Sequence, residues 1–279
     1  MDNLTSLFLS QSYQDTWDDY NRSISSETFP VWDYIILTAS DNNQAEGYYK
    51  QIEERKDFLP SRTHFAVIPD EGGVRVGSGG ATLSVLKYIY EREGRFDGIR
   101  TLVIHSGGDS KRVPTYSALG KLFSPVPHKL PNGRSSTLFD EFIIAMASVP
   151  PRIREGMLLL SGDVLLLFNP LQIDFSGKGA AVISFKEQVE TGKNHGVFLN
   201  GEKGHVRKFL HKQTVETLTE MGAVNENNCV DIDTGAIIFS PELLEQLYSL
   251  IDTQEKYKKY VNNTVRLSLY GDFLYPLAE

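Results

Sequence analysis

The sequence predicts an α/β fold, in which a doubly wound, mainly parallel sheet is followed by a mixed, β-rich second half. In the first half, short β-rich runs alternate with segments of helical periodicity, the pattern of successive βαβ units. The run GMLLLSGD at residues 156–163 is apolar almost to its end, as expected of a parallel strand buried on both faces. From residue 179 onward the β runs are short and closely spaced, which indicates a sheet of more mixed character.

The first half contains the elements that build the parallel sheet. Strands are predicted at residues 32–40, 63–70, 101–106 and 156–163. Helices are predicted at residues 42–56, 81–94 and 135–148. Asp41 is the expected N-cap of the first helix, with Gln44 three residues later. Leu83, Leu86 and Ile89 recur at a spacing of three and therefore share one face of the second helix.

The second half contains further β runs and two more helices. The β runs are GAAVISFK, GVFLN, GHVRKFL and DTGAIIFS, and the helices are expected from Pro241 and near Thr253. No internal repeat and no linker rich in Pro or Ser divides the chain, so we expect one domain over residues 1–279, with residues 1–30 as an N-terminal extension. The abrupt apolar end, FLYPLAE, indicates a fragment of a longer polypeptide.

The composition argues against several classes of protein. The net charge is −8, from 28 basic and 36 acidic residues, whereas a nucleic-acid binder would carry a basic face. The single cysteine, Cys229, allows no internal disulfide, which fits a reducing compartment. No signal peptide is visible, and no stretch approaches the roughly 18 apolar residues of a membrane span. We therefore expect a cytoplasmic protein that has neither nucleic acid nor membrane as a partner.

Ligands of open α/β sheets bind at the carboxyl ends of the strands, so the loops there are the most informative. The loop after residue 70 contains Gly77, Gly79 and Gly80 directly before a predicted helix. Glycines allow close approach of the backbone to a phosphate, and successive N–H groups at a helix start form an anion cradle. The alternative is a tight structural turn. The loop matches neither the Rossmann fingerprint nor a P-loop.

The loop at residues 104–127 is more specific, because a strand end is followed by Gly107 and Gly108, two prolines, Arg112 and Lys121. The planar fork of Arg fits two phosphate oxygens, and Lys supplies a point charge. Fixed cations of this kind stabilise the charge that develops on a departing pyrophosphate. This combination favours the binding of a nucleoside triphosphate. The alternative is a solvated basic loop.

Asp163 follows the most apolar strand and is a candidate ligand for Mg²⁺, which proteins bind through one or two carboxylates plus substrate phosphates. Its alternative role is to cap the following turn. Asp233 and Asp272 are both candidates for a second carboxylate, and the sequence does not rank them. No H-E-x-x-H and no G-x-S-x-G motif occurs, so transition-metal chemistry and covalent nucleophilic catalysis have no support.

The loop resembles the signature of sugar-nucleotide pyrophosphorylases. Gly107, Gly108 and Arg112 fall at the family spacing, and Lys121 is followed four residues later by a Pro-Val pair. Ser110 and Lys111 depart from the family pattern, and Lys121 arrives one residue early. The ordered motifs RVGSGGATL, IHSGGDSKRVP, GKLFSPVP, LFDEFI and SGDVLL resemble the fucose-1-phosphate guanylyltransferase branch, including the transferase part of bifunctional fucokinase/fucose-1-phosphate guanylyltransferases.

This resemblance implies a Rossmann-like, nucleotidyltransferase-type sheet and the reaction of GTP with L-fucose 1-phosphate to give GDP-L-fucose and pyrophosphate. Mg²⁺ is the implied cofactor. A C-terminal kinase domain in the full-length chain and association into a homo-oligomer are two further expectations. Two alternatives stay open: a transferase for another pair, such as mannose 1-phosphate or UTP, and a nucleotide-sugar binding module without catalysis. An acceptor carboxylate or carbonyl facing N1 and N2 of guanine would favour GTP.

The resemblance also assigns roles to individual residues. Arg112 would clamp the β- and γ-phosphates, Lys121 would neutralise the α-phosphate region, and Asp163 would hold Mg²⁺. The residues implied to contact the nucleotide are Gly77, Gly79, Gly80, Thr82, Gly107 and Gly108. The residues implied to bind the sugar phosphate are Asn194, Lys208 or Lys212, and Gly235, the last lying two residues after Asp233.

Overall fold

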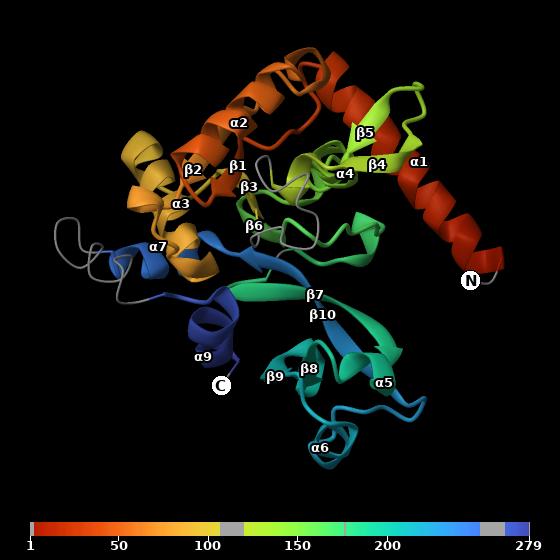
Figure 1. Cartoon of the computed structure of the whole chain (residues 1–279). Helices are drawn as coiled ribbons and strands as arrows, with labels where there is room; N and C mark the ends of the chain where they lie inside the picture. Colours follow the sequence, from red (N-terminus) through yellow and green to blue (C-terminus); the bar gives the residue numbers. More distant parts are fainter. Residues whose placement is uncertain (1–2, 107–119, 176, 252–265, 279) are drawn as a thin grey trace.

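The computed structural model describes residues 3–106, 120–175, 177–251 and 266–278 (Figure 1). The helices are α1 (Asn3–Ser25), α2 (Asn42–Glu53), α3 (Gly77–Glu93), α4 (Leu138–Ala145), α5 (Val189–Gly192), α6 (Val215–Glu220), α7 (Pro241–Ser249) and α9 (Tyr275–Leu277). The strands are β1 (Tyr34–Ala39), β2 (His64–Pro69), β3 (Arg100–His105), β4 (Pro125–Lys129), β5 (Ser135–Thr137), β6 (Gly156–Ser161), β7 (Ala180–Gln188), β8 (Gly196–Asn200), β9 (Val206–His211) and β10 (Cys229–Phe239). A 3₁₀ turn, η4 (Lys121–Phe123), and a π-helical segment, η8 (Leu269–Leu274), also contribute to the site described below.

One eight-stranded sheet runs through the molecule in the order β2-β1-β3-β6-β10-β8-β9, with β7 paired to β10. The strands β2, β1, β3 and β6 are parallel, whereas β10 is antiparallel to β6, β7 and β8. The change from parallel to antiparallel pairing therefore occurs at the β6–β10 boundary. Figure 1 shows β7 and β10 extending from the parallel part towards a small lobe formed by α5, α6, β8 and β9. The predicted mixed α/β sheet is confirmed.

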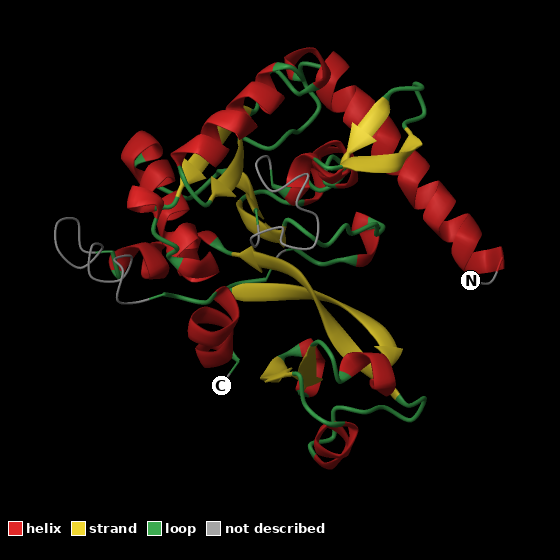
Figure 2. Cartoon of the chain, in the orientation of Figure 1, coloured by secondary structure: helices red, strands yellow, loops and turns green. Residues whose placement is uncertain are grey.

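Helices cover both faces of the parallel strands, as the colours of Figure 2 show. On one face, Leu37 and Ile104 pack with Tyr48 of α2 and Phe142 of α4. On the other face, alternate residues of the same strands pack with α3, α7 and the C-terminal segment. A third cluster, which includes Val197 and Leu210, lies in the small lobe. The uninterrupted apolar runs of the strands follow from this two-sided burial.

The local sequence signals agree with most of the observed elements. The Asp41 carboxylate accepts from the backbone N–H of Gln44 at 2.9 Å, so the predicted N-cap is confirmed. The helix predicted at residues 135–148 is shorter, because residues 135–137 form strand β5, which pairs with β4. The helix expected near Thr253 lies outside the described residues. None of the helices in the described part of the chain has the length and apolarity to cross a membrane.

His105 links the parallel sheet to helix α3 from a buried position. Its Nδ1 lies 3.3 Å from the Thr38 hydroxyl on β1, and its Nε2 lies 3.1 Å from the Thr82 hydroxyl on α3. Burial lowers the pKa of His105 to about 4, so the imidazole is neutral in the folded protein. These two contacts give each ring nitrogen of His105 a hydrogen-bond partner without placing a charge in the core.

We expect His105 to make the fold sensitive to acid. Its unfolded pKa is near 6.5, so below that pH the unfolded chain binds a proton that the folded chain excludes. The stability that depends on this group is complete above about pH 6.5 and falls by about 3 kcal/mol as the pH drops to about 4. His105→Gln removes the titrating group and should flatten this part of the pH dependence in urea unfolding, whereas His205→Gln, at an exposed position, should not. If the free energy of unfolding of His105→Gln fell with decreasing pH as steeply as that of wild type, this role of His105 would be contradicted.

Candidate active site

The candidate active site lies at the carboxyl edge of the parallel strands, where β1, β2, β3 and β6 all end. The loops after these strands are those in which the sequence placed the ligand. Residues 107–119, which follow β3, lie outside the described residues, and with them the predicted site residues Gly107, Gly108 and Arg112. The structure places the remaining predicted residues as follows.

The η4 turn fixes Lys121 at this edge. Gly120, which precedes it, has a φ of 68°, and any Cβ there would collide with the Tyr48 hydroxyl. Leu122 and Phe123 are buried in the core on the other side of the turn. Lys121 is held by its buried neighbours while a third of its side chain stays exposed (33%).

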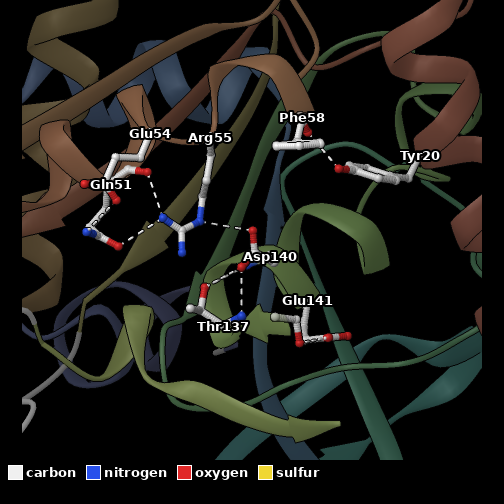
Figure 3. Close-up of polar contacts among 9 residues, drawn as sticks. Tyr20, Gln51, Glu54, Arg55, Phe58, Thr137, Asp140 and Glu141 are labelled. Atoms are coloured by element: carbon white, nitrogen blue, oxygen red, sulfur yellow. Dashed lines mark hydrogen bonds and ion pairs between the residues drawn. The ribbon is translucent and has the colours of Figure 1, made fainter. Parts of the chain in front are cut away.

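Arg55, which follows the C-terminal end of helix α2, anchors the same segment. Its guanidinium lies 5.3 Å from the centre of the Phe123 ring, within the range of a cation–π contact. Its Nε donates to Asp140 at 3.1 Å, and the second oxygen of Asp140 accepts from the backbone N–H of Thr137 at 2.8 Å (Figure 3). Because both partners of this ion pair are almost buried, with side chains 14% and 11% exposed, the pair joins α2 and α4 and fixes the turn that carries Lys121.

Lys121 faces Asp163, the carboxylate that follows β6. Its Nζ lies 3.5 Å from Oδ2 of Asp163, and the Ser161 hydroxyl donates to Oδ1 at 2.6 Å. The Asp163 side chain is 45% exposed, so this pair adds little to stability. A cation and a carboxylate held together at an open edge are suited to bind phosphate and a divalent cation.

Asp233 lies on β10, at a bulge in its pairing with β7. Gly235 has a φ of 74° and donates its backbone N–H to Oδ1 of Asp233 at 2.9 Å. The Thr234 hydroxyl donates to the Ile183 carbonyl at 2.6 Å, which secures the other side of the bulge. Burial raises the pKa of Asp233 to about 6, although the Gly235 N–H, Tyr270 and His195 act in the opposite direction. The carboxylate is thus partly desolvated and lacks a formal cation partner among the described residues.

Tyr270 brings the two carboxylates into one site. Its hydroxyl donates to Asp233, and burial, followed by the charges of Asp233 and Asp163, raises its pKa. Its ring stacks on Phe209 of β9, with ring centres 5.8 Å apart. A Cβ on Gly235 would lie 3.1 Å from this hydroxyl and 3.1 Å from Cβ of Ser161, so glycine permits the close approach. The sequence reasoning missed Tyr270 because only the chain's return through η8 places it here.

The donor set fits Mg²⁺ better than a transition metal. No group of three or more His, Cys, Asp or Glu side chains with metal-binding geometry occurs among the described residues. The site offers two carboxylates, Asp163 and Asp233, which is the small oxygen set that Mg²⁺ takes when substrate phosphates and water complete its shell. The desolvated Asp233 would gain a counter-charge on binding a cation.

Asp272 belongs to a different part of the structure. Its carboxylate accepts from the backbone N–H of Ser268 at 2.6 Å, one turn earlier in its own segment. It also lines an apolar cavity with Leu83, Leu247 and Leu277. The structure thus brings Asp233 and Asp163 together at Tyr270, whereas Asp272 caps a turn, which favours Asp233 as the candidate second carboxylate.

The predicted glycine cradle is the first turn of α3 rather than a loop before it. Gly77 has a φ of 78°, and a Cβ there would collide with the Leu267 carbonyl oxygen. Gly79 donates its N–H to the same oxygen at 2.9 Å, and the N–H of Leu269 donates to the Ser78 hydroxyl at 2.9 Å. The alternative that the sequence left open, a structural role, accounts for Gly77 and Gly79, because the C-terminal segment packs directly on them.

Gly80 and Thr82 are buried within α3. The Thr82 hydroxyl donates to the Ser78 carbonyl at 2.8 Å and contacts His105, so its hydrogen bonds are used inside the protein. This placement does not agree with the expected contact of Thr82 with a nucleotide. Of the glycines, Gly77 lines a cavity of about 200 Å³ at the carboxyl edge.

The residues expected to bind the sugar phosphate lie in the small lobe. Asn194 is exposed in the turn before β8, next to His195, which acts on Asp233. In β9, Phe209 faces Tyr270, so strand alternation puts Lys208 on the opposite face, across from Leu199, and this argues against Lys208 as a ligand.

Lys212 remains the better of the two lysine candidates. It follows β9 in an exposed turn, and its backbone N–H donates to the His195 carbonyl at 2.9 Å. Gly235, in contrast, lies directly at the site through its contact with Asp233.

Comparison with known proteins decides the family. The model of the fucose pyrophosphorylase domain matches residues 94–279. The chain belongs to this family. The bifunctional fucokinase/GDP-fucose pyrophosphorylase of Arabidopsis thaliana is 29% identical over 93% of this chain and 28% of its own length. The fucose-1-phosphate guanylyltransferase of Mus musculus is 29% identical over 88% of this chain and 46% of its own length.

Two further comparisons concern a bacterial relative and a solved structure. The L-fucokinase/L-fucose-1-P guanylyltransferase of Bacteroides fragilis is 27% identical over 76% of this chain and 23% of its own length. The crystal structure of HddC from Yersinia pseudotuberculosis complexed with GMP-PN covers 88% of this chain and 85% of its own, with 11% identity and a TM-score of 0.38. The chain thus spans less than half the length of the curated relatives named here.

The fucose pyrophosphorylase domain includes the charged part of the candidate site. Lys121, Asp163, Asp233 and Tyr270 all lie within the matched residues 94–279. The glycine turn of α3 precedes the match. The resemblance inferred from the sequence motifs is confirmed at the level of the family.

We expect Gly77→Ala to test whether Gly77 is required for packing. A Cβ would strain the backbone at positive φ and collide with the Leu267 carbonyl, so the free energy of unfolding should fall by about 2–4 kcal/mol. Gly94→Ala is the matched control, because Gly94 has a φ of 67° with open space around it, and it should cost about 1 kcal/mol. Equal losses in urea unfolding would show that the contact with Leu267 adds nothing.

Proposed function

We propose that this chain is a nucleotidyltransferase domain that condenses GTP with L-fucose 1-phosphate to form GDP-L-fucose and pyrophosphate. The observation that carries the proposal is the opposition of Lys121 and Asp163 at the carboxyl edge, within the part of the chain that matches the fucose pyrophosphorylase domain. The sheet would then be the doubly wound, Rossmann-like sheet of a nucleotidyltransferase. The names of the relatives, which include fucose-1-phosphate guanylyltransferase, support the choice of both substrates.

The chemistry is an in-line displacement at the α-phosphorus of GTP. A phosphate oxygen of the sugar 1-phosphate forms the new bond to this phosphorus, and the bond from the α-phosphorus to the bridging oxygen breaks, so that pyrophosphate leaves. The nucleophile is already an anion, and the reaction therefore needs no general base. Catalysis must come from positioning two polyanions and from stabilising the charge on the leaving group.

The residues of the site can be assigned to these tasks. Lys121 would neutralise charge near the α-phosphate, and Arg112, outside the described residues, would bind the departing pyrophosphate. Asp163 and Asp233 would hold Mg²⁺, which supplies further positive charge to the phosphates when bound. Tyr270 would orient Asp233 through its hydrogen bond.

The sugar would lie on the side of the small lobe. Gly235 borders the site next to Asp233, and Asn194 and Lys212 lie in turns at the same end of β8 and β9. We further propose a cytoplasmic enzyme, since the chain has one cysteine and an acidic net charge. A kinase domain attached C-terminally and a homo-oligomer also remain proposals, the first supported by the bifunctional relatives.

The reaction is tested by measuring pyrophosphate release from the purified chain with Mg²⁺. GTP, ATP, UTP and CTP are compared with L-fucose 1-phosphate, and mannose 1-phosphate serves as the control acceptor. Release with GTP and L-fucose 1-phosphate is expected. Release only with another pair would retain the chemistry and reject the proposed substrates, and the lack of release from a folded chain and from a longer form carrying the downstream region would reject the enzyme.

We expect Asp163 and Asp233 to be required for activity and Asp272 to be dispensable for it. Asp163→Asn and Asp233→Asn should each lower kcat/KM for pyrophosphate release by about 100-fold or more, because each removes charge that would hold the metal. Asp272→Asn is the matched control and should stay within about threefold of wild type, since its carboxylate only accepts a backbone hydrogen bond. A large loss in Asp272→Asn with little loss in Asp233→Asn would reverse the assignment.

A further inference from the structure

A small cavity at the carboxyl edge lies beside the charged site and is not used by it. It has a volume of about 200 Å³ and lies over the ends of β1, β2 and β3 and the first turn of α3. Asp70, Ser78 and Ser106 are among the residues that line it. The lining combines small side chains with one carboxylate, Asp70, and two larger polar groups, Arg75 and His105. This set suits a flat polar ligand better than an apolar one.

Asp70 supplies the carboxylate of this cavity. It follows β2 directly, and its backbone is fixed on both sides, because its N–H donates to the Ala39 carbonyl at 2.8 Å and its carbonyl accepts from Gly73 at 3.1 Å. Its Oδ2 has only a long contact of 3.4 Å to the backbone N–H of Val76. Its Oδ1 has no hydrogen-bond partner among the described residues. A rigidly mounted carboxylate that lines the cavity thus keeps unused acceptor capacity.

The surroundings of Asp70 keep this acceptor desolvated but charged at neutral pH. Burial raises its pKa to about 6, whereas the neighbouring Arg75 acts to lower it. Asp41 is the nearest other carboxylate that affects it, and that group is occupied as the N-cap of α2. A desolvated acceptor of this kind makes strong hydrogen bonds to a ligand with two adjacent donors.

We propose that Asp70 selects guanine by accepting hydrogen bonds from its N1–H and its 2-amino group. This inference rests on the proposed function, whose nucleotide substrate it specifies. Guanine presents these two donors side by side on one edge. Adenine presents a lone pair at N1, which a carboxylate would repel, and uracil and cytosine do not present such a donor pair. A carboxylate at this position is one of the two kinds of acceptor that would favour GTP.

The position of the cavity agrees with the rest of the site. Asp70 ends β2 and Asp163 follows β6, and the strand order β2-β1-β3-β6 separates them by three strand spacings, or about 14 Å. A nucleoside triphosphate with its base at Asp70 would cross the ends of β1 and β3 and bring its phosphates to Lys121. The same edge then continues through Asp163 to Asp233 and the small lobe. Base, phosphates and sugar would follow the order of the strands.

Asp70→Asn tests this assignment by exchanging one acceptor for a donor. Asn offers an acceptor and a donor, which match the N1–H and the 2-oxo group of xanthine rather than the edge of guanine. The variant should lose about 10- to 100-fold in kcat/KM for GTP and gain in preference for xanthosine triphosphate. Wild type should favour GTP over inosine triphosphate, which lacks the 2-amino group, by about 10-fold or more. Asp41→Asn, which keeps the N-cap, should retain the wild-type order.

Affinities for the same nucleotides, measured by calorimetry, separate this inference from the proposed reaction. If neither this chain nor the longer form releases pyrophosphate with any pair, the proposed function fails, and a shift of binding from GTP to xanthosine triphosphate in Asp70→Asn would still support the base contact. Equal changes for GTP, inosine triphosphate and xanthosine triphosphate would overturn it. A wild-type preference for ATP or UTP, or no binding of any nucleotide by the folded chain, would overturn it as well.

Discussion

The burial of the four parallel strands on both faces is the constraint on which the rest of the structure depends. Leu37, Ile104 and Leu159 are typical of the apolar side chains that fill these strands, and the buried polar ones, Thr38, Thr101 and His105, carry no charge. Charged side chains can therefore gather only where the strands end. Parallel pairing brings those ends to one edge, so the fold itself concentrates Asp70, Lys121 and Asp163 there.

The antiparallel strand β10 supplies a second carboxylate, Asp233, to the edge formed by the parallel strands. It returns beside β6, and its bulge turns Asp233 towards the same edge at a point where Gly235 allows Ser161 and Tyr270 to approach. Burial leaves the Asp233 carboxylate partly desolvated, and a bound cation would offset the free energy that this desolvation costs. The boundary between parallel and antiparallel pairing is thus where the carboxylates from the two halves of the chain meet.

Local patterns in the sequence were sufficient for most strands and helices, for the Asp41 cap and for the position of Asp163 after β6. They were insufficient wherever a contact joins distant parts of the chain. Gly77 has the spacing of a phosphate loop, yet it serves the packing of Leu267, and the choice between Asp233 and Asp272 depends on the position of Tyr270. Asp70 ends a strand whose following loop was expected to lie near the ligand, but only the structure shows that its carboxylate lines a cavity.

The most direct test of the whole account is a crystal structure of the chain with GDP-L-fucose and Mg²⁺. We expect guanine against Asp70, the pyrophosphate group between Lys121 and Asp163, and fucose beside Asp233 and Gly235. The structure also contains a larger cavity of about 580 Å³ at the opposite end of the sheet, lined by Arg154 and Glu242 among others. A nucleotide sugar bound there, with the carboxyl edge empty, would contradict the account.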